Sequence, residues 1–249
     1  MNICIQDLSF KYGDKPLFNN INVEVECLDR PIIILGPSGS GKTTLLKLLA
    51  GLLKPEKGEI CFCDEAPPPG EKPEVKALKT AFMFQESRLL PWLTVLENVS
   101  LPLKNDFGRE EGVERAKHFL SMVSLSEKLN SYPMELSGGE AQRVSMARAF
   151  AWPAPVLLMD EPFQSLDIPL RINLIDLTLS LLEKEKRFLI TVTHDPRMAV
   201  YMGARIIILG KPGEGIVLDK KVLLSDGDRS FSSAAGRELE RELIGRLGP

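Results

Sequence analysis

The sequence predicts an α/β fold in which helices cover a parallel β-sheet. Apolar strand patterns at residues 156–159, 188–192 and 205–209 alternate with helical periodicity. A further run, Pro31–Leu35, is almost wholly apolar, which is typical of a strand buried on both faces. A glycine-rich turn and a helical pattern over residues 44–50 follow it directly, so the chain has the strand–loop–helix units that build parallel sheets.

The N-terminal residues predict an antiparallel β region. Residues 2–10 and 21–27 alternate apolar and polar side chains in the manner of half-buried strands, with a turn at Gly13-Asp14 between them. Two further strands are expected at residues 58–63 and 80–84.

Residues 64–74 are rich in proline and acidic side chains, which predicts an exposed loop. From about residue 86 to residue 153 the pattern becomes helical, with an amphipathic helix at 110–124 that contains a structural His118. We therefore expect a helical subdomain inserted into the α/β core.

Residues 225–249 form a C-terminal tail in which residues 233–247 predict an amphipathic helix. This helix is expected either to pack on the domain or to bind a partner. Its expected apolar stripe consists of Leu239, Leu243, Ile244 and Leu247.

Composition indicates a globular protein of 249 residues, with 44 % hydrophobic and 26 % charged residues. We expect one domain spanning residues 1–249, with no signal peptide and no apolar run near the roughly 20 residues of a membrane helix. The net charge of −3 and the lack of a long basic block argue against a nucleic-acid partner. Reduced, packed thiols in a cytosolic protein are favoured over a zinc site or a disulfide for Cys4, Cys27, Cys61 and Cys63.

The glycine-rich turn fits the phosphate-loop (P-loop) pattern of glycine, four residues, then Gly-Lys-Ser/Thr. Its glycines let successive backbone N–H groups turn toward one centre at a helix N-terminus, which is an anion site. Lys42 can reach the β- and γ-phosphates, and the Thr43 hydroxyl can ligate Mg²⁺. The alternative is a Gly/Ser-rich turn before an ordinary helix. The residues expected to bind the nucleotide here are Gly36, Pro37, Ser38, Gly39, Ser40, Gly41, Lys42, Thr43 and Thr44.

Asp160 and Glu161 end the strand at 156–159. Because ligands bind at the carboxyl ends of parallel strands, both carboxylates are expected beside the P-loop. Asp160 can hold Mg²⁺ in the Walker B role, and Glu161 can act as general base toward a water in line with the γ-phosphate. An acidic turn without chemistry is the alternative.

The string Leu-Ser-Gly-Gly-Glu at residues 136–140 predicts a helix start. Ser137 and Glu140 form a capping box, but two glycines in the first turn cost about 1 kcal/mol each in helix propensity. Bare amides at a helix N-terminus make a second phosphate-binding surface, which suggests that Ser137, Gly138, Gly139 and Glu140 contact the nucleotide of another chain.

These features resemble the nucleotide-binding subunit of an ABC transporter over Met1 to about Leu224. Such a resemblance implies a P-loop NTPase (RecA-like) core with the antiparallel β region and the inserted helical subdomain described above. The motifs that carry it are the P-loop, Gln85 after a strand, residues 136–140, the Asp160-Glu161 pair, and His194 after a strand.

For the single chain, the resemblance implies that Tyr12 stacks on adenine. Gln85 is expected to bridge Mg²⁺ or water and to sense a membrane partner, and His194 to hydrogen-bond the γ-phosphate. Ser165-Leu166-Asp167 resembles the D-loop, in which Asp167 orders a dimer seam.

For the assembly, the resemblance implies a head-to-tail dimer that holds two ATP molecules with Mg²⁺. Ser137, Gly138 and Gly139 of one copy then contact the γ-phosphate bound by Lys42 of the other. The implied partners are a second copy, a membrane permease and, indirectly, an extracytoplasmic solute-binding protein. The chain is expected to be cytoplasmic and peripheral on the inner face of the membrane.

Three positions depart from common family patterns. Glu140 stands in place of glutamine, which the capping box accommodates. Gln164 stands where a small residue is usual, and Met198 replaces an acidic residue common after the switch histidine. The last two put fine contacts near the seam in doubt.

Residues 85–95 resemble the importer branch that serves nitrate, sulfonate, taurine and thiamine-precursor systems. Trp92 and Leu93 are expected either to line a groove for a permease helix or, in the case of Trp92, to fill a subdomain core. We therefore expect an ATP-binding and ATP-hydrolysing subunit of an ABC importer for a small solute. The alternatives are an ABC exporter ATPase, a soluble ABC ATPase acting on DNA or the ribosome, and a regulatory module that binds nucleotide without hydrolysis.

Overall fold

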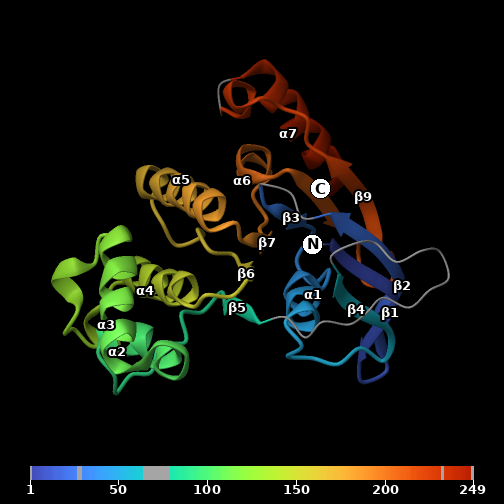
Figure 1. Ribbon diagram of the computed structural model, residues 1–249. Helices are drawn as coiled ribbons and strands as arrows, with labels where there is room; N and C mark the ends of the chain where they lie inside the picture. Colours follow the sequence, from blue (N-terminus) through green and yellow to red (C-terminus); the bar gives the residue numbers. More distant parts are fainter. Residues whose placement is uncertain (1, 27–29, 64–78, 231–232, 248–249) are drawn as a thin grey trace. The chain divides into compact units, whose positions relative to one another are not determined.

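The computed structural model describes residues 2–26, 30–63, 79–230 and 233–247. The chain divides into two compact units (Figure 1). The terminal unit consists of residues 1–79 and 188–249, and the middle unit of residues 80–187. The loop expected at residues 64–74 and the residue Cys27 lie outside the described residues, as does the side chain of Cys63.

In the terminal unit, a three-stranded antiparallel sheet has the order β2-β1-β4 (Figure 1). Its strands are β1 (Asn2–Tyr12), β2 (Lys15–Glu26) and β4 (Lys57–Cys63), and the turn at residues 13–14 is confirmed. Strand β2 starts at Lys15, whereas the prediction placed its start at residue 21. The reason is that the β1/β2 register shifts between Leu8 and Lys11, which breaks the regular alternation that the prediction relied on.

Four further strands of this unit follow in the order β7-β3-β8-β9. Strand β3 (Ile32–Leu35) pairs in parallel with β7 (Phe188–Val192) and with β8 (Arg205–Leu209). All residues of β3 and β7 are buried, which confirms the predicted parallel strands. Strand β9 (Ile216–Lys221) is antiparallel to β8 and was not predicted, because it is half exposed and its last three residues are charged.

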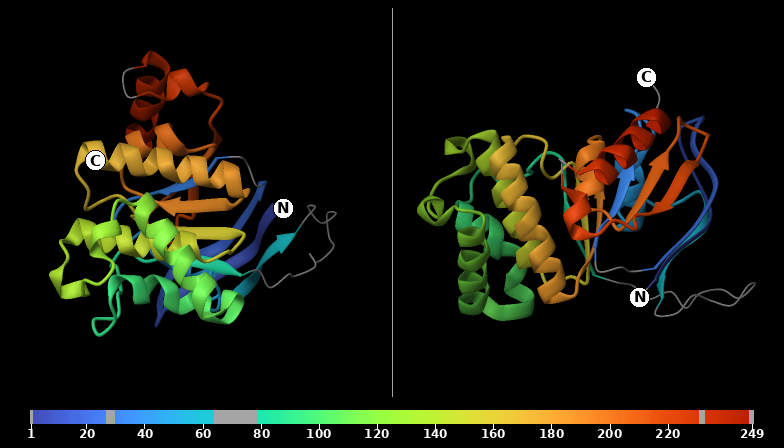
Figure 2. Two further views of the ribbon diagram at one scale, coloured as in Figure 1. Left: turned by 60° about the vertical axis from the view of Figure 1, so that its left-hand side comes forward. Right: turned by 90° about the horizontal axis from the view of Figure 1, so that it is seen from above.

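The helices of this unit are α1 (Lys42–Leu49), α6 (Pro196–Met202), the short helix η4 (Asp226–Arg229) and α7 (Ala234–Leu247). Helices α6 and α7 lie side by side (Figure 2), with an ion pair of 2.7 Å between Arg197 Nε and Glu240 Oε1. The tail helix is confirmed and it buries Leu239 and Leu243, but Ile244 is 50 % exposed. The predicted four-residue apolar stripe is therefore wrong at Ile244.

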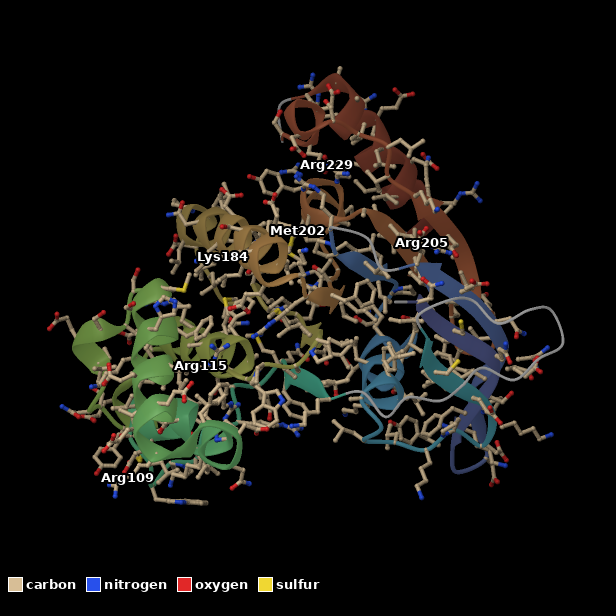
Figure 3. The ribbon with its side chains drawn as sticks, viewed as in Figure 1. Arg109, Arg115, Lys184, Met202, Arg205 and Arg229 are labelled. Atoms are coloured by element: carbon tan, nitrogen blue, oxygen red, sulfur yellow. The ribbon has the colours of Figure 1, made fainter. Side chains whose placement is uncertain are left out.

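Arg229 anchors the segment that leads into α7 (Figure 3). Its buried guanidinium donates hydrogen bonds to the carbonyl oxygens of Gly203, Val200, Val222 and Leu224. Burial lowers the pKa of Arg229. A charged group this deep is tolerated because several carbonyl dipoles face it.

In the middle unit, strands β5 (Thr80–Met83) and β6 (Val156–Asp160) pair in parallel, with Met83 opposite Met159. Helix α3 begins at Lys104, whereas the helix was predicted to begin at residue 110. Gly108 has a φ of 73°, so α3 is kinked there, and the part after the kink corresponds to the predicted helix. The helices of the unit are α2 (Val95–Ser100), η1 (Leu101–Leu103), α3 (Lys104–Met122), η2 (Ser126–Lys128), η3 (Pro133–Glu135), α4 (Gly138–Ala151) and α5 (Ile168–Glu185).

The core of the helical segment lies between α2, α3 and α4. Phe119 and Phe150 are buried and stack with their ring centroids 6.5 Å apart. Arg115 of α3 donates from Nε to the carbonyl oxygen of Ala151, the last residue of α4, at 2.6 Å (Figure 3). Trp92 is 69 % exposed, so the alternative that it fills this core is wrong.

Cys4 and Cys61 stand opposite one another on β1 and β4 as buried thiols without a disulfide, and Cys61 Sγ donates to the carbonyl oxygen of Cys4 at 3.4 Å. His118 is exposed on α3, with its ring edge against Phe119. None of the helices in the described ranges has the length and hydropathy that crossing a bilayer requires.

Candidate active site

In the terminal unit, the predicted P-loop joins the end of β3 to the start of α1. Gly41, the N-cap of α1, has a φ of 95°, and a Cβ there would lie 2.7 Å from Phe18 Cζ. At Gly36 a Cβ would lie 2.6 Å from Ser40 Oγ and 2.7 Å from the carbonyl oxygen of Leu209. The loop is therefore folded so closely on its surroundings that only glycine fits at these two positions.

The Lys42 side chain turns back over this loop. Its Nζ donates to the carbonyl oxygens of Gly36 at 2.8 Å and Pro37 at 3.0 Å. Among the described residues, the buried hydroxyl of Ser40 has no hydrogen-bond partner. Helix α1 also lacks a side-chain cap, so its first amides point into the loop without one. An ammonium, a hydroxyl and open amides around one turn fit the oxygens of a phosphate group.

A cavity of about 310 Å³ adjoins the loop. Tyr12 of β1 is 53 % exposed beside it, and its hydroxyl lies 3.3 Å from Thr44 Oγ1. An aromatic ring next to a phosphate cradle suits the stacking of a nucleobase, as expected of Tyr12. The lining residues are Tyr12, Leu17, Gly39, Gly41, Lys42, Thr43 and Thr44. Leu17 was not anticipated, because nothing in the sequence marks a single leucine on a strand as a lining residue.

His194 lies at the same edge of the sheet as the P-loop. The parallel register places Val192 of β7 beside Ile34 of β3, and the amide of Thr193 donates to the Ile34 carbonyl at 3.1 Å. His194 follows and is exposed. The structure thus brings Tyr12, the P-loop and His194 together within the terminal unit.

Met198, which departs from the family pattern, is buried in α6. The N-cap of this helix is Asp195, whose Oδ1 accepts from the amides of Arg197 and Met198. The side chain of Met198 is therefore part of the core of this unit.

In the middle unit, Asp160, Glu161 and Gln85 also share one sheet edge. Asp160 is the buried last residue of β6, and Gln85 comes two residues after β5, which pairs with β6 in parallel. Glu161 is buried and has a φ of 50°, in the left-handed region. This conformation is costly for a residue other than glycine, and such strain is concentrated at functional sites.

The segment after Gln85 is held by Arg148 of α4. The guanidinium of Arg148 donates to the carbonyl oxygens of Ser87 at 2.8 Å and Arg88 at 3.0 Å. Arg88 has a φ of 44°, and its guanidinium lies 4.0 Å from the centroid of the Phe84 ring. Burial lowers the pKa of Arg148. The two carbonyl oxygens that accept from its guanidinium offset the cost of burying this charge. Nothing in the sequence marks Arg148, because an arginine on a helix carries no signal of its partner.

The N-terminus of α4 has the predicted capping box. The Glu140 amide donates to Ser137 Oγ at 3.2 Å, and the Ser137 amide donates to Glu140 Oε2 at 2.8 Å. These bonds from Ser137 hold the pKa of the Glu140 carboxyl below its usual value. Apart from its chain neighbours and the backbone of α4 itself, no described atom lies within 4 Å of a Cβ placed at Gly138, so the first turn presents bare backbone to an approaching group.

The expected D-loop residue Asp167 is the N-cap of helix α5, and its Oδ1 accepts from the amide of Leu170 at 3.0 Å. Gln142 of α4 contacts the turn Glu161–Ser165 at both ends, and nothing in the sequence marks it as a residue of the site. The middle unit thus brings Gln85, Asp160 and Glu161 to one sheet edge, and the Ser137–Glu140 motif begins α4, where Gly139 packs near Ser165 and Leu166.

Comparison with known proteins gives the family. The sequence pattern described as "ABC transporter" matches residues 18–164. The chain belongs to the ABC transporter family. The family predicted from the motif order is thus confirmed.

Curated relatives of this ABC protein cover nearly its full length. The aliphatic sulfonates import ATP-binding protein SsuB of a Bacillus cereus strain is 40 % identical and covers 98 % of this chain and 95 % of its own length. A second such protein, SsuB 1 of Paracoccus denitrificans, is 34 % identical, over 99 % of this chain and 93 % of its own length.

Solved structures confirm the P-loop NTPase fold for this ABC protein. The ATP-binding cassette MJ0796 in a dimeric post-hydrolysis state with ADP and inorganic phosphate is 32 % identical, with a TM-score of 0.75. A second dimeric structure of MJ0796 is 31 % identical, with a TM-score of 0.77. Each covers 90 % of this chain and 100 % of its own.

Proposed function

We propose that this ABC protein is the ATP-binding and ATP-hydrolysing subunit of an importer. The observation that carries the proposal is the cavity beside the glycine loop, where Tyr12, Lys42 and Thr44 surround space for a base and its phosphates. The names of the curated relatives, which are import ATP-binding proteins, support import as the direction of transport.

In the nucleotide complex, the loop from Gly36 to Thr44 binds the triphosphate of ATP. Lys42 exchanges the carbonyls of Gly36 and Pro37 for the β- and γ-phosphates, while the amides of the loop and of α1 bind the remaining oxygens. The ring of Tyr12 stacks on the base. His194 donates to the γ-phosphate from the neighbouring strand end.

The side chains proposed to hold Mg²⁺ fit the ion only when the phosphates of the nucleotide supply further ligands. The described residues contain no group of three or more His, Cys, Asp or Glu side chains that would hold a metal alone. Mg²⁺ is usually bound by one or two carboxylates together with substrate phosphates and water. The Thr43 hydroxyl, the Asp160 carboxylate and the Gln85 amide oxygen would be the protein groups that hold it, directly or through water. The ion supplies positive charge for the β- and γ-phosphate oxygens during hydrolysis.

Hydrolysis uses the carboxylate of Glu161 as general base. It accepts a proton from the water that attacks the γ-phosphate, and the left-handed backbone at Glu161 fixes the direction of that carboxylate. General base catalysis of this kind contributes typically about 10²–10⁴-fold to the rate.

The functional form is a head-to-tail dimer in which the Ser137, Gly138 and Gly139 of one copy contact the γ-phosphate on the other. ATP favours the closed dimer only because it binds that state more tightly than the open one, and hydrolysis removes this difference. The dimeric state of the MJ0796 structures supports this assembly.

A membrane permease is the partner that uses the closure. The subunit is cytoplasmic, lies on the inner face of the membrane, and works with an extracytoplasmic solute-binding protein. The cargo class is an anionic small solute such as a sulfonate, as in the names of the relatives. The inserted helical subdomain at about residues 86–153, with its exposed Trp92, faces the permease, and the C-terminal tail at residues 225–249 packs on the terminal unit through α7.

The experiment is phosphate release by the purified protein with ATP and Mg²⁺, together with gel filtration. Glu161→Gln is expected to reduce turnover by about 10²–10⁴-fold and to accumulate as an ATP-dependent dimer. Glu183→Gln, an exposed carboxylate on α5 of the same unit, is the matched control and is expected to behave as wild type. Full turnover in Glu161→Gln would contradict the assignment of Glu161, and no turnover in wild type would contradict the enzyme assignment.

A further inference from the structure

Gln142 lies on α4 and is 5 % exposed. Both polar atoms of its side-chain amide are bonded to a single turn of the chain. Nε2 donates to the carbonyl oxygen of Glu161 at 3.0 Å, and Oε1 accepts from the amide of Ser165 at 3.3 Å. One buried side chain therefore holds both ends of the turn Glu161–Ser165.

This turn contains the proposed general base. Glu161 has a φ of 50°, and its carbonyl oxygen also accepts from the amide of Gln164 at 3.4 Å. A residue keeps such a conformation only where its surroundings hold it there. The bond from Gln142 fixes the orientation of the Glu161 peptide plane, and hence the direction in which the carboxylate leaves the backbone.

The same contact fixes the turn to the helix that begins with the Ser137–Glu140 motif. A Cβ at Gly139 would lie 3.6 Å from the carbonyl oxygen of Ser165 and 3.5 Å from Leu166 Cδ2. Gly139 and Gln142 are three residues apart, so they lie on one face of α4. This face therefore contacts the turn at two successive levels, by close packing at Gly139 and by the amide of Gln142.

We propose that Gln142 is a positioning residue for hydrolysis, which holds the Glu161 turn against the signature helix α4. When α4 takes up the γ-phosphate of the partner subunit, the general base of its own subunit is thereby held in place. The proposal rests on the proposed function, because it assumes that Glu161 is the base. The competing explanation is that Gln142 only satisfies buried backbone groups and stabilises the fold.

Two substitutions separate positioning from stability. Gln142→Met has a similar length but neither donates nor accepts these bonds. Gln142→Asn keeps the amide but is one methylene shorter, so it cannot reach both atoms. Ser145→Ala is the matched control, because Ser145 is buried on the same helix and, within the described residues, its Oγ has no hydrogen-bond partner.

The first readout is steady-state hydrolysis. We expect both Gln142 variants to lower kcat at least tenfold, with the KM for ATP and the ATP-dependent dimer within about twofold of wild type, since misplacing a reacting group by about 1 Å can cost 10²-fold. Ser145→Ala should keep the wild-type kcat. A rise in KM with unchanged kcat, or wild-type rates in both Gln142 variants, overturns the proposal.

The second readout is a double-mutant cycle with Glu161→Gln. If Gln142 acts through Glu161, Gln142→Met lowers the residual rate of Glu161→Gln by less than twofold. A full, additive loss in that background shows a general structural effect and overturns the proposal.

The third readout is amide hydrogen exchange at Ser165 without nucleotide. Its exchange should be at least tenfold faster in Gln142→Met than in wild type, and unchanged in Ser145→Ala. Equal exchange in wild type and Gln142→Met overturns the proposal even where neither protein hydrolyses ATP. A wild-type protein with no ATPase activity but a protected Ser165 amide refutes the proposed function alone.

Discussion

The side-chain amide of Gln85 donates from Nε2 to Oε1 of Gln164 at 3.2 Å. Gln164 is one of the positions at which this sequence departs from the common family pattern, where a small residue is usual. A serine or alanine could not reach Gln85, so the contact follows from that departure. It holds the side chain of Gln85 in one rotamer through Nε2, while Oε1, the atom proposed to bridge Mg²⁺ or water, takes no part in the bond.

Replacing Gln164 by serine is expected to release this rotamer of Gln85, so that Oε1 can turn to Mg²⁺ without breaking the bond from Nε2. A net hydrogen bond of this kind is worth about 0.5–1.5 kcal/mol, so the Mg²⁺ concentration for half-maximal ATPase should fall by about two- to tenfold. The measurement is phosphate release against Mg²⁺ at saturating ATP, and Gln85→Ala is the reference background. A shift of the same size in that background would contradict the prediction, because Gln164 would then act without Gln85.

Gly41 in the P-loop and Gly13 in the turn between β1 and β2 offer a matched pair of substitutions. Gly41→Ala combines a φ of 95° with a contact of 2.7 Å to Phe18, so we expect ATP affinity to fall by at least about tenfold as the loop shifts. Gly13 has a φ of 58°, but apart from its chain neighbours no described atom lies within 4 Å of a Cβ placed there. Gly13→Ala should therefore cost about 1 kcal/mol of stability and leave ATP affinity unchanged. Titration with a fluorescent ATP analogue compares the two. Equal losses of ATP affinity in the two variants would show that backbone strain alone lowers the affinity, and not a shift of the P-loop.

Tyr12 separates the contribution of its ring from that of its hydroxyl. Tyr12→Ala removes the proposed stacking surface, worth about 1–3 kcal/mol per base, and should weaken ATP binding by roughly five- to 150-fold. Tyr12→Phe loses only the contact to Thr44 and should stay within about threefold. Isothermal titration with ATP and Mg²⁺ measures both. Loss in Tyr12→Phe as large as in Tyr12→Ala would assign the effect to the hydroxyl and not to stacking.

Glu140 predicts a pH dependence of stability. The bonds from Ser137 lower the pKa of the folded-state carboxyl, so its stabilisation is fully present above the unfolded-state pKa and is lost as the pH falls through the folded-state value. Glu140→Gln can still form the capping box but does not titrate. Its free energy of unfolding in urea should therefore be lower than that of wild type at pH 7, and the difference should shrink toward pH 4 and below. A difference that grows on acidification would contradict this.

The sequence predicted the parts of the fold that depend on local pattern. The buried runs at β3, β6, β7 and β8 are almost wholly apolar, and the capping box at Ser137 is written in four consecutive residues. Strand β9 was not predicted, because this edge strand is half exposed and its charged residues resemble those of a loop. The start of β2 escaped because register shifts in its pairing with β1 leave no regular alternation.

In the candidate site, too, the residues that belong to a local sequence pattern were predicted, and those that depend on tertiary contacts were not. The P-loop, Asp160, Glu161 and Ser137 are contiguous strings whose chemistry can be read along the chain. Gln142 and Arg148 contact their targets through side-chain bonds to backbone atoms 19 to 61 positions away in sequence. Such partners depend on the fold, so a glutamine or an arginine on a helix gives no sign of them. The exposure of Trp92 likewise could not be derived, because tryptophan serves both cores and interfaces.

The most direct test of the account is a structure of Glu161→Gln with ATP and Mg²⁺. We predict a head-to-tail dimer in which Ser137 Oγ and the Gly139 amide of one copy lie about 3 Å from the γ-phosphate held by Lys42 of the other. A structure with ATP bound at the P-loop, but with Ser137 and Gly139 far from every γ-phosphate in all pairings of copies, would contradict it.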